Sequence, residues 1–386
     1  MSVTDVTELK RSQLESLARH RESLRKTPNL RWLFFEITDR CNLSCRHCGS
    51  SCTTEGRFLT TEDIDAVRKS VKAASMNIDT APKPGESADR NINIAPKPVK
   101  TARTNRPTVC LTGGEPMLHS DFYEIAQCVR DNGFYWGMTT NATLIDDDAA
   151  EKLRQAGMST VSVSLDGMEE SHDALRQRKG AWRLALRGIE SLQKAGFEPQ
   201  VTTVIYRGNF EDLEPLYDLL SGMGVTNWRP INVEPIGRAC ESGDLLLSPG
   251  QLDDLLSYIR GKRFDIDNSM EVTFGCSHYL GVEYARMVRD HYFLCGAGIL
   301  TASVRSNGDI CACLDIENRP ELVQGNIRKD DFMEVWQDRF EAFRRDRTAD
   351  SEKCVTCPER FICGGDSTHT WDFDKNEPLL CYRDCF

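Results

Sequence analysis

The chain lacks three features that would each decide its class at once: a signal peptide, a membrane-spanning stretch and a long basic run. Its first segment, MSVTDVTELKRSQLESLARHRESLRK, has no apolar core, and no later stretch reaches the roughly 20 apolar residues that span a bilayer. The formal net charge of −11 disfavours nucleic-acid binding through phosphate neutralisation. We therefore expect a cytoplasmic protein with neither a membrane nor a nucleic-acid partner.

Disulfide bonds are also expected to be missing. The chain has 16 cysteines, but a reducing compartment keeps thiols reduced, and Cys311 and Cys313 are too close in sequence for an ordinary bridge. Nine of the cysteines lie between Cys276 and Cys385. This usage indicates metal or redox chemistry, concentrated toward the C-terminus.

Strand and helix patterns alternate through the first part of the chain. After a charged amphipathic helix over 5–27, short apolar runs are separated by segments with helical periodicity. Repeated strand–helix units predict an α/β fold with a parallel sheet, open or closed into a barrel, under a layer of helices. In such barrels the chemistry gathers at the C-terminal ends of the strands. The predicted strands are 32–37, 108–112, 135–139, 160–165, 200–205 and 227–233, and the predicted helices are 121–131, 146–156, 181–195 and 211–222.

The chain divides by pattern into three parts. At 386 residues it is long enough for one large domain and a smaller one. We expect an N-terminal helical extension over 1–30, a barrel over 31–240 and, where the alternation fades, a linker helix and cysteine-rich domain over 241–386. Residues 76–106 interrupt the barrel with NIDTAPKP and the similar NINIAPKP. That composition buries little apolar surface and predicts a solvated, partly disordered insertion, with a docking segment as the alternative.

Three cysteines follow the first predicted strand in the spacing C-x3-C-x2-C. Thiolates at Cys41, Cys45 and Cys48 can each bind one iron of a [4Fe–4S] cluster, which leaves the fourth iron open to another ligand. Zinc is the competing metal, because structural zinc takes four ligands and Cys52 can supply the fourth. Unliganded thiols are the third interpretation, although exposed reactive cysteines are a liability.

The motif CNLSCRHC resembles that of the radical S-adenosylmethionine (radical SAM) enzymes, and the resemblance extends over about 31–240. It implies a partial (β/α)6 barrel in which the open iron chelates the amino and carboxylate groups of SAM. An aromatic or similar residue commonly precedes the third cysteine in this family. His47 holds that place and is assigned a supporting role, since a bare histidine is more often a surface residue.

The segment LTGGEP, residues 111–116, follows the second predicted strand. Gly113 and Gly114 let the backbone pass close to a ligand, and Glu115 can accept a hydrogen bond from an ammonium group. Family members bind the SAM amino group with this segment. By itself, GGEP is more typical of a tight turn.

Three further positions match the family with less specificity. Asn141 follows the third strand, Ser164 ends the fourth, and Arg176 lies in HDALR. The resemblance implies a polar SAM contact for Asn141, a ribose or carboxylate contact for Ser164 and a carboxylate contact for the Arg176 guanidinium. The alternatives are an Asx turn at Asn141 and a surface salt bridge at Arg176. VEPIGRA, residues 233–239, resembles the segment near the adenine, or is a plain proline–glycine loop.

The C-terminal cysteines resemble the SPASM extension of radical SAM enzymes over about 290–386. The spacings are C-x12-G-x4-C, ending at Cys313, and then C-x2-C-x5-C. The resemblance implies two auxiliary iron–sulfur clusters of the [4Fe–4S] type. Eight thiolates suffice for both: Cys276, Cys295, Cys313, Cys354, Cys357, Cys363, Cys381 and Cys385.

One position departs from the SPASM pattern. The family continues C-x5-C-x3-C, but the last position here is Ser367. We expect Cys276 and a C-terminal cysteine to replace it, with Asp366 as an oxygen ligand if either is only a packing residue. Cys311 is an alternate to Cys313, and a zinc ribbon is the alternative for Cys354 and its neighbours. The remaining cysteines, Cys110, Cys128 and Cys240, lie in apolar or helical patterns and are expected to be packing residues rather than ligands.

The resemblance implies reductive cleavage of SAM, hydrogen abstraction from a substrate and electron removal by the auxiliary clusters. We expect a peptide or small-protein substrate, an oxidised or cross-linked product, and an electron donor such as flavodoxin or ferredoxin. Asp315 is the candidate base, although it stands one residue later than the aspartate of the sulfatase-maturing branch. The alternatives are a sulfatase maturase, a haem or small-molecule maturase, and a non-enzymatic iron–sulfur or zinc module.

Overall fold

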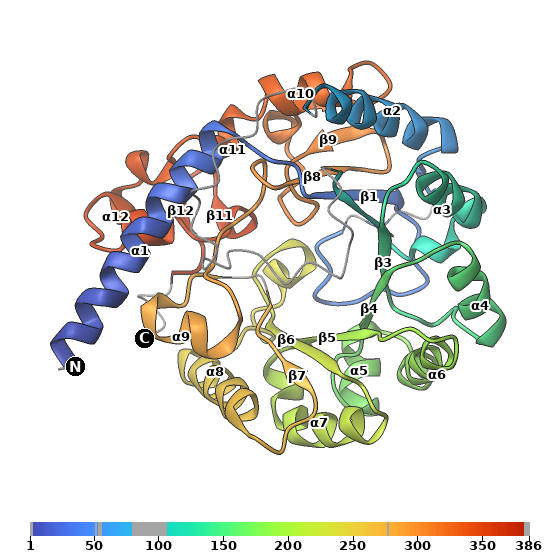
Figure 1. The fold of residues 1–386 in the computed structure, drawn as a ribbon. Coiled ribbons are helices and arrows are strands. Elements are labelled where there is room, and N and C mark those ends of the chain that lie inside the picture. Colours follow the sequence, from blue (N-terminus) through green and yellow to red (C-terminus); the bar gives the residue numbers. More distant parts are fainter. Residues whose placement is uncertain (1–2, 51, 53–55, 79–105, 276–277, 382–386) are drawn as a thin grey trace.

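The structure is a computed structural model that describes residues 3–50, 52, 56–78, 106–275 and 278–381. Most of the predicted insertion at 76–106 lies outside the described residues, as do Cys276 and Cys385. Figure 1 shows the helices arranged around a curved sheet whose strands surround the middle of the molecule.

Six parallel strands form the centre of this sheet and follow one another in chain order. Each lies within one residue of its predicted bounds, so the predicted α/β fold with a parallel sheet is confirmed. The alternation in QVTTVI of the fifth strand shows why: every second side chain is buried. The strands are β1 (Trp32–Thr38), β2 (Thr108–Gly113), β3 (Trp136–Thr140), β4 (Thr160–Ser164), β5 (Gln200–Ile205) and β6 (Asn227–Asn232).

Helices cover the outside of the strands, and their buried side chains form the main core with the sheet. Four of them match the predicted ranges within two residues: α3 (Phe122–Asp131), α4 (Asp147–Gln155), α6 (Ala181–Lys194) and α7 (Leu213–Gly222). Local chemistry sets their ends; Asp146, for example, accepts a hydrogen bond from the Ala149 N–H at 2.8 Å. The helices α2 (Thr61–Ile78), α5 (Glu169–Arg176) and α8 (Pro249–Phe264) complete this layer.

The C-terminal region extends the same sheet. The strand β8 (Thr301–Val304) pairs in parallel with β1, and β9 (Asp309–Cys311) and β10 (Gly325–Asn326) continue outward as antiparallel strands. At the other edge, β7 (Glu271–Val272) pairs with β6. The predicted division near residue 240 stays a prediction, but residues on both sides of it share one sheet.

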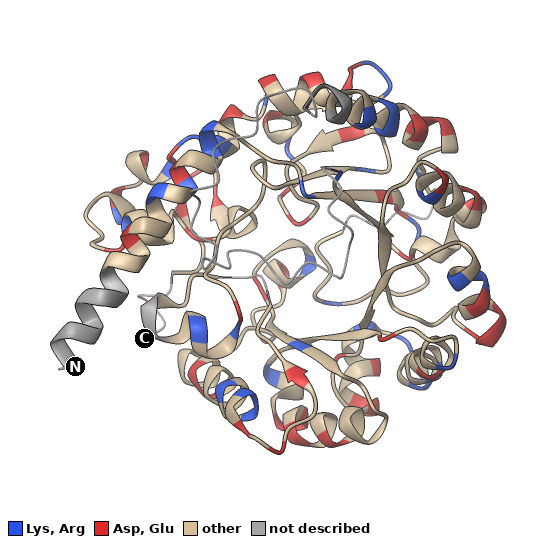
Figure 2. Cartoon of the chain, viewed as in Figure 1, with Lys and Arg blue, Asp and Glu red and all other residues tan. Residues whose placement is uncertain are grey.

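The N-terminal helix α1 (Val3–Lys26) packs against α13 (Arg360–Cys363) of the cysteine-rich region. Its Leu14 and Leu17 are buried, as expected for the apolar side of the predicted helix. Figure 2 shows charged residues of both signs mainly on the outer helices. The other elements are α9 (Gly281–Val288), α10 (Phe332–Asp338), α11 (Glu341–Arg344), α12 (Glu352–Val355), β11 (Trp371–Asp372), β12 (Glu377–Pro378) and 3-10 turns at Pro116–Leu118, Arg207–Asp212, Gly237–Glu241, Pro320–Leu322, Arg347–Asp350 and Thr368–Thr370.

Within the described part of the chain, every helix is too short or too polar to cross a bilayer.

Candidate active site and auxiliary cluster site

The loop that carries Cys41, Cys45 and Cys48 leaves the C-terminal end of β1. Cys45 is buried beside Leu43 and Ala181, and the other two thiols pack against this group. Arg238, which follows β6, holds the loop from the far side of the barrel: its Nε donates to the Cys45 carbonyl at 2.7 Å and its N–H to the Cys48 carbonyl at 3.1 Å. The three predicted ligands therefore lie together in a braced loop at the end of the sheet where barrel enzymes place their chemistry.

Cys52 joins this group of thiols. Its side chain is hydrogen-bonded with those of Cys41 and Cys48, and this contact is the largest cause that lowers the pKa of Cys48 to about 6. A fourth thiol is thus present, as the zinc interpretation requires. Within the described ranges, however, no group of three His, Cys, Asp or Glu side chains is spaced to hold a single metal ion.

Gly113 and Gly114 have a structural role in addition to the predicted one. A Cβ atom at Gly114 would lie 2.2 Å from the Arg40 carbonyl oxygen, and one at Gly113 would lie 2.2 Å from the Thr38 carbonyl oxygen. The Gly114 N–H donates to the Thr38 carbonyl at 2.9 Å. Only glycine lets the end of β2 approach the cysteine loop this closely.

Glu115 is fully buried at the same end of the sheet. Its carboxylate accepts hydrogen bonds from the Thr140 hydroxyl at 2.8 Å and from the Asn141 N–H at 2.9 Å, but no cation is paired with it among the described residues. Burial raises its pKa to about 7, more than these hydrogen bonds lower it. A buried carboxylate without a counter-ion, next to the cysteine loop, fits the positively charged amino group of SAM.

Asn141 connects the third strand to the cysteine loop. Its side-chain amide donates to Asn42 Oδ1 at 2.9 Å, and its carbonyl oxygen accepts from the Thr143 N–H at 3.0 Å, which is an Asx turn. The turn that the sequence left as an alternative is therefore present. Ser164 is half-buried at the end of β4, on the sheet edge where the predicted ribose contact would be made.

Arg176 has its partners inside the protein. Its Nε donates to Asp166 Oδ2 at 2.6 Å, and its Nη1 donates to the Cys45 sulfur at 3.7 Å. Burial lowers the pKa of Arg176, but the Asp166 carboxylate raises it more, so the guanidinium stays charged. The structure thus shows Arg176 bracing a cysteine of the loop, and the surface salt bridge considered from the sequence is instead a buried one.

His47 lies beside the same ion pair. Its Nε2 is 4.0 Å from Asp166 Oδ2, and its Nδ1 is buried with no hydrogen-bond partner among the described residues. Burial lowers the pKa of His47 to about 4, against the opposing effect of Asp166. The imidazole is therefore neutral at physiological pH, with one nitrogen available to a ligand.

Four cysteines of the C-terminal region surround one cavity of about 230 Å³: Cys354, Cys357, Cys363 and Cys381. Cys354 lies on α12, Cys357 lies between the two short helices, Cys363 ends α13, and Cys381 is at the end of the described chain. Four converging thiols are the donor set of a fully ligated [4Fe–4S] cluster. The sequence-based prediction listed eight cysteines for two clusters and did not say which four share a cluster.

Comparison with known families decides the class of this protein. The radical SAM superfamily matches residues 93–221, and the SPASM iron–sulfur cluster-binding domain matches residues 295–358. The chain is a radical SAM enzyme with a SPASM domain. The match begins after the cysteine loop of this enzyme, so the assignment of Cys41, Cys45 and Cys48 depends on their motif and on the geometry above.

Curated relatives of the radical SAM enzyme differ in what they make. An AdoMet-dependent heme synthase from Nitratidesulfovibrio vulgaris is 28% identical, over 92% of this chain and 94% of its own length. The mycofactocin maturase MftC from Mycolicibacterium smegmatis is also 28% identical, over 86% of this chain and 76% of its own length. Among solved structures, anSMEcpe with bound AdoMet has a TM-score of 0.66 at 19% identity and covers 92% of this chain and 94% of that one. This last likeness shows a shared fold.

Two of the other cysteines predicted as ligands in the SPASM domain, Cys295 and Cys313, have protein partners. Cys295 lies 3.2 Å from the Thr368 hydroxyl, and Cys313 donates to the Asp315 carboxylate at 3.9 Å. Cys311 is buried in β9. The contact to Cys313 places the exposed Asp315 beside a predicted ligand, which is where its proposed role as a base requires it.

Asp366 belongs to a buried network that the sequence reasoning missed. It accepts a hydrogen bond from the Tyr279 N–H at 2.9 Å and lies 3.4 Å from His278 Nδ1. His278 Nε2 is 3.0 Å from Glu234, whose other oxygen is 2.6 Å from His369 Nε2. This series of side-chain contacts connects the β6 end of the barrel to the SPASM domain. The polar residues beside Ser367 were only a weak signal for this network, because no spacing rule links positions 234, 278 and 369.

Proposed function

We propose that Cys41, Cys45 and Cys48 hold a [4Fe–4S] cluster whose open iron binds SAM. The observation that carries this proposal is the convergence of the three thiols beside the buried, unpaired Glu115 carboxylate. When bound, the cluster and SAM supply one electron to the sulfonium, a 5′-deoxyadenosyl radical and hydrogen abstraction from a substrate. The chain's residues bind and orient these groups and exclude water.

Each neighbouring side chain has a role that follows from its contacts. Glu115 accepts from the SAM amino group, while Gly113 and Gly114 allow the close approach of the backbone. Arg176 acts through Cys45, because its guanidinium is committed to Asp166 and to that sulfur.

Three weaker contacts complete the proposed SAM site. Asn141 positions the cysteine loop through Asn42, Ser164 is proposed to contact the ribose, and the free Nδ1 of neutral His47 is available for a polar contact.

The cavity lined by Cys354, Cys357, Cys363 and Cys381 is proposed to hold an auxiliary [4Fe–4S] cluster that accepts an electron from the substrate. A second auxiliary cluster on the remaining predicted ligands stays a prediction, because two of them, Cys276 and Cys385, lie outside the described residues. The reducing electron is proposed to come from a flavodoxin or ferredoxin.

A tetrapyrrole is the proposed substrate class. The heme synthase relative matches this chain over nearly its whole length, whereas the match to the MftC maturase leaves about a quarter of that protein uncovered. This preference differs from the peptide substrate expected from the sequence. A peptide substrate, with Asp315 as the base that forms an oxidised or cross-linked product, is the second candidate because MftC is equally identical where it aligns.

The test of the first step is a dithionite assay for 5′-deoxyadenosine under anaerobic conditions. C45A should lose about four iron atoms per chain and the nucleoside product, whereas C240A, at an exposed thiol, should lose neither. If C45A keeps both iron and product, the proposed site is wrong. Substrate class is then tested by incubating the intact enzyme with SAM and either iron coproporphyrin or candidate precursor peptides, and the productive partner is the one converted in step with 5′-deoxyadenosine.

A further inference from the structure

The inner face of the barrel is the side of the sheet that is turned away from the helices (Figure 1). Along β2 to β6, side chains of the main core under the helices alternate with others. These others therefore line the inner face. They include Cys110, Thr139, Ser162, Thr202 and Arg229. Thr139 is exposed although β3 is paired on both sides, so solvent reaches this face.

Arg229 is the one charged residue of this set. It is the third of the six residues of β6, and Cys110 is the third of the six residues of β2. Three strands separate β2 from β6 in the sheet. Burial nevertheless raises the pKa of Cys110 to about 11 against two opposing effects, its contact with Thr139 and the charge of Arg229. The guanidinium therefore extends over the inner face toward β2, deeper in the barrel than the strand ends that carry the cysteine loop and Glu115.

The Arg229 guanidinium has no acidic partner in the described part of the chain. The residue is half-buried, and its Nε is buried without a hydrogen bond. The carboxylate of Glu36, on the inner side of β1, is already engaged, because it accepts from the Ser306 N–H at 3.0 Å and lies near Arg305. A charge held inside a protein is normally paired, so this one is available to a ligand.

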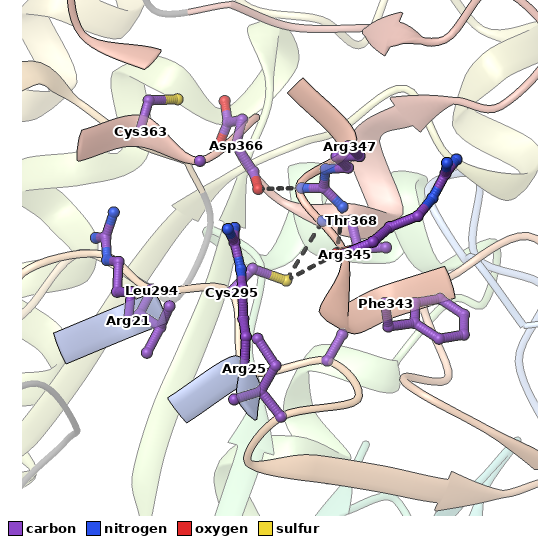
Figure 3. Close-up of a pocket in the computed structure, with 13 residues that line it drawn as sticks. Arg21, Arg25, Leu294, Cys295, Phe343, Arg345, Arg347, Cys363, Asp366 and Thr368 are labelled. Carbon is purple, nitrogen blue, oxygen red and sulfur yellow. Dashed lines mark hydrogen bonds between the residues drawn. The ribbon is translucent and has the colours of Figure 1, made fainter. Parts of the chain in front are cut away.

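Iron–sulfur clusters on the described thiols do not supply the missing negative charge. Other guanidinium groups lie next to those thiols: Arg176 and Arg238 at the cysteine loop, and Arg347 beside Cys295 (Figure 3). Clusters bound at these positions therefore act on other arginines and leave Arg229 without a partner.

We propose that Arg229 binds a carboxylate group of the substrate inside the barrel. The inference rests on the proposed function, because it takes the substrate to enter the barrel next to SAM. A guanidinium binds a carboxylate through two parallel N–H donors, and the exposed Thr139 hydroxyl is a further donor on the same face. On a tetrapyrrole the carboxylate belongs to a propionate side chain, and on a peptide it belongs to Asp, Glu or the C-terminus. Such an anchor would fix which part of the substrate faces SAM.

Two other anions compete for this arginine. The first is the carboxylate of SAM, although SAM is proposed to bind at the strand ends beside Glu115. The second is a cluster on Cys276, which lies outside the described residues and follows Gly275, whose N–H donates to the Pro230 carbonyl at 3.2 Å, next to Arg229. Iron content and SAM affinity are therefore measured in every variant.

The test uses the full chain with its clusters reconstituted anaerobically and SAM present. Iron coproporphyrin is titrated into the wild type, R229M, R229K and R187M, and binding is followed by the absorbance of the porphyrin. R229M should bind about 10- to 100-fold more weakly, because a charge-assisted contact is lost. R229K should lie between the two, since lysine keeps the charge and not the planar fork. R187M, at an exposed arginine of α6, should bind like the wild type.

The methyl ester of iron coproporphyrin separates a carboxylate contact from a structural role. The wild type should bind the free acid more tightly than the ester, and R229M should lose about 10- to 100-fold of this preference. A residue that only braced the barrel would change the binding of acid and ester equally when it is replaced.

Two further arms distinguish the source of the carboxylate. Candidate precursor peptides are compared with forms in which Asn and Gln replace Asp and Glu and the C-terminus is amidated. Sodium propionate carries the carboxylate alone, and ligand-observed NMR should show weak binding to the wild type that R229M loses. If iron coproporphyrin and the peptides fail to bind while propionate binding still depends on Arg229, the proposed substrate class is wrong and the carboxylate site is right.

Three outcomes would overturn the inference. The first is that Arg229 affects the binding of neither iron coproporphyrin, nor the peptides, nor propionate. The second is an equal loss of affinity for the acid and the ester in R229M. The third is a loss of iron or of SAM affinity in R229M, which would assign the guanidinium to a cluster or to SAM.

Discussion

The Glu115 carboxylate gives a prediction whose size can be worked out from its burial. In the folded chain without SAM, burial raises its pKa from the ordinary 4.5 to about 7. The folded state therefore holds this proton more tightly than the unfolded state, and its stability falls as the pH rises from about 4.5 through 7. Above pH 7 the full cost is present, and moving a carboxyl pKa that far corresponds to about 3 kcal/mol.

The perturbation is Glu115→Gln, which cannot ionise. The glutamine oxygen can still accept from the Asn141 N–H, but its NH2 then faces the Thr140 hydroxyl, which must turn from donor to acceptor; this exchange adds a destabilising offset of about 1 kcal/mol at every pH. The dependence of the folding stability on the ionisation of residue 115, however, should be absent in E115Q. With an unfolding entropy of about 2.1 cal/mol/K per residue, about 3 kcal/mol in a chain of this length corresponds to about 4 °C.

The assay is a series of anaerobic melting curves of the cluster-loaded protein from pH 5 to pH 8, without SAM. About 2.5 kcal/mol of this cost arises between pH 5 and pH 8, so the wild type should lose about 3 °C more than E115Q over this range. E124Q, at an exposed glutamate of α3, should follow the wild type. Saturating SAM should remove most of the wild-type loss, because its amino group neutralises the carboxylate. If E115Q keeps the wild-type dependence on pH, the carboxylate is not held at a cost and the reasoning is refuted.

Three further predictions concern other residues. C354S should lower iron by about four atoms per chain while 5′-deoxyadenosine formation with dithionite persists, and loss of both would place Cys354 in the SAM site. D166N leaves the Arg176 guanidinium buried without its carboxylate, so we expect the free energy of unfolding to fall by about 3–5 kcal/mol and SAM to bind more weakly. Denaturant titrations and SAM-binding titrations measure the two effects, and the control D148N, at an exposed site, should change little in both. Burial lowers the pKa of His278, but Asp366 and Glu234 raise it to about 10. The stability that these ion pairs contribute is therefore complete below pH 6.5 and is lost as the pH rises through 10. The melting temperature of the wild type should fall over that range, and that of H278Q should not.

The fold was largely predictable because each strand carries its own signal. The short apolar runs of β1 to β6 are bounded by turns and separated by helical periodicity, so pairing in chain order follows. The addition of β8 to β1 was not predictable. That pairing joins Trp32 to Thr301, and a contact between positions so far apart leaves no trace in local periodicity.

The candidate site divides in the same way. Cys41, Cys45, Cys48 and Glu115 stand in short motifs, and the structure brings them to one end of the sheet. The role of Arg176 could not be predicted, because whether its guanidinium binds a ligand or Asp166 depends on burial in the tertiary structure. The burial of Arg21 on α1 could not be predicted either, since an arginine on an amphipathic helix normally faces water.

The pairing of β8 with β1 also has a consequence for biosynthesis. Ribosomes add about 5–20 residues per second, so β1 emerges some tens of seconds before its neighbour at Thr301–Val304 is made. During that interval one edge of the first strand, directly before the cysteine loop, has no partner. Insertion of the metal cofactor into this loop is therefore expected to follow completion of the chain, and a nascent polypeptide stalled before residue 301 is expected to aggregate through that open edge.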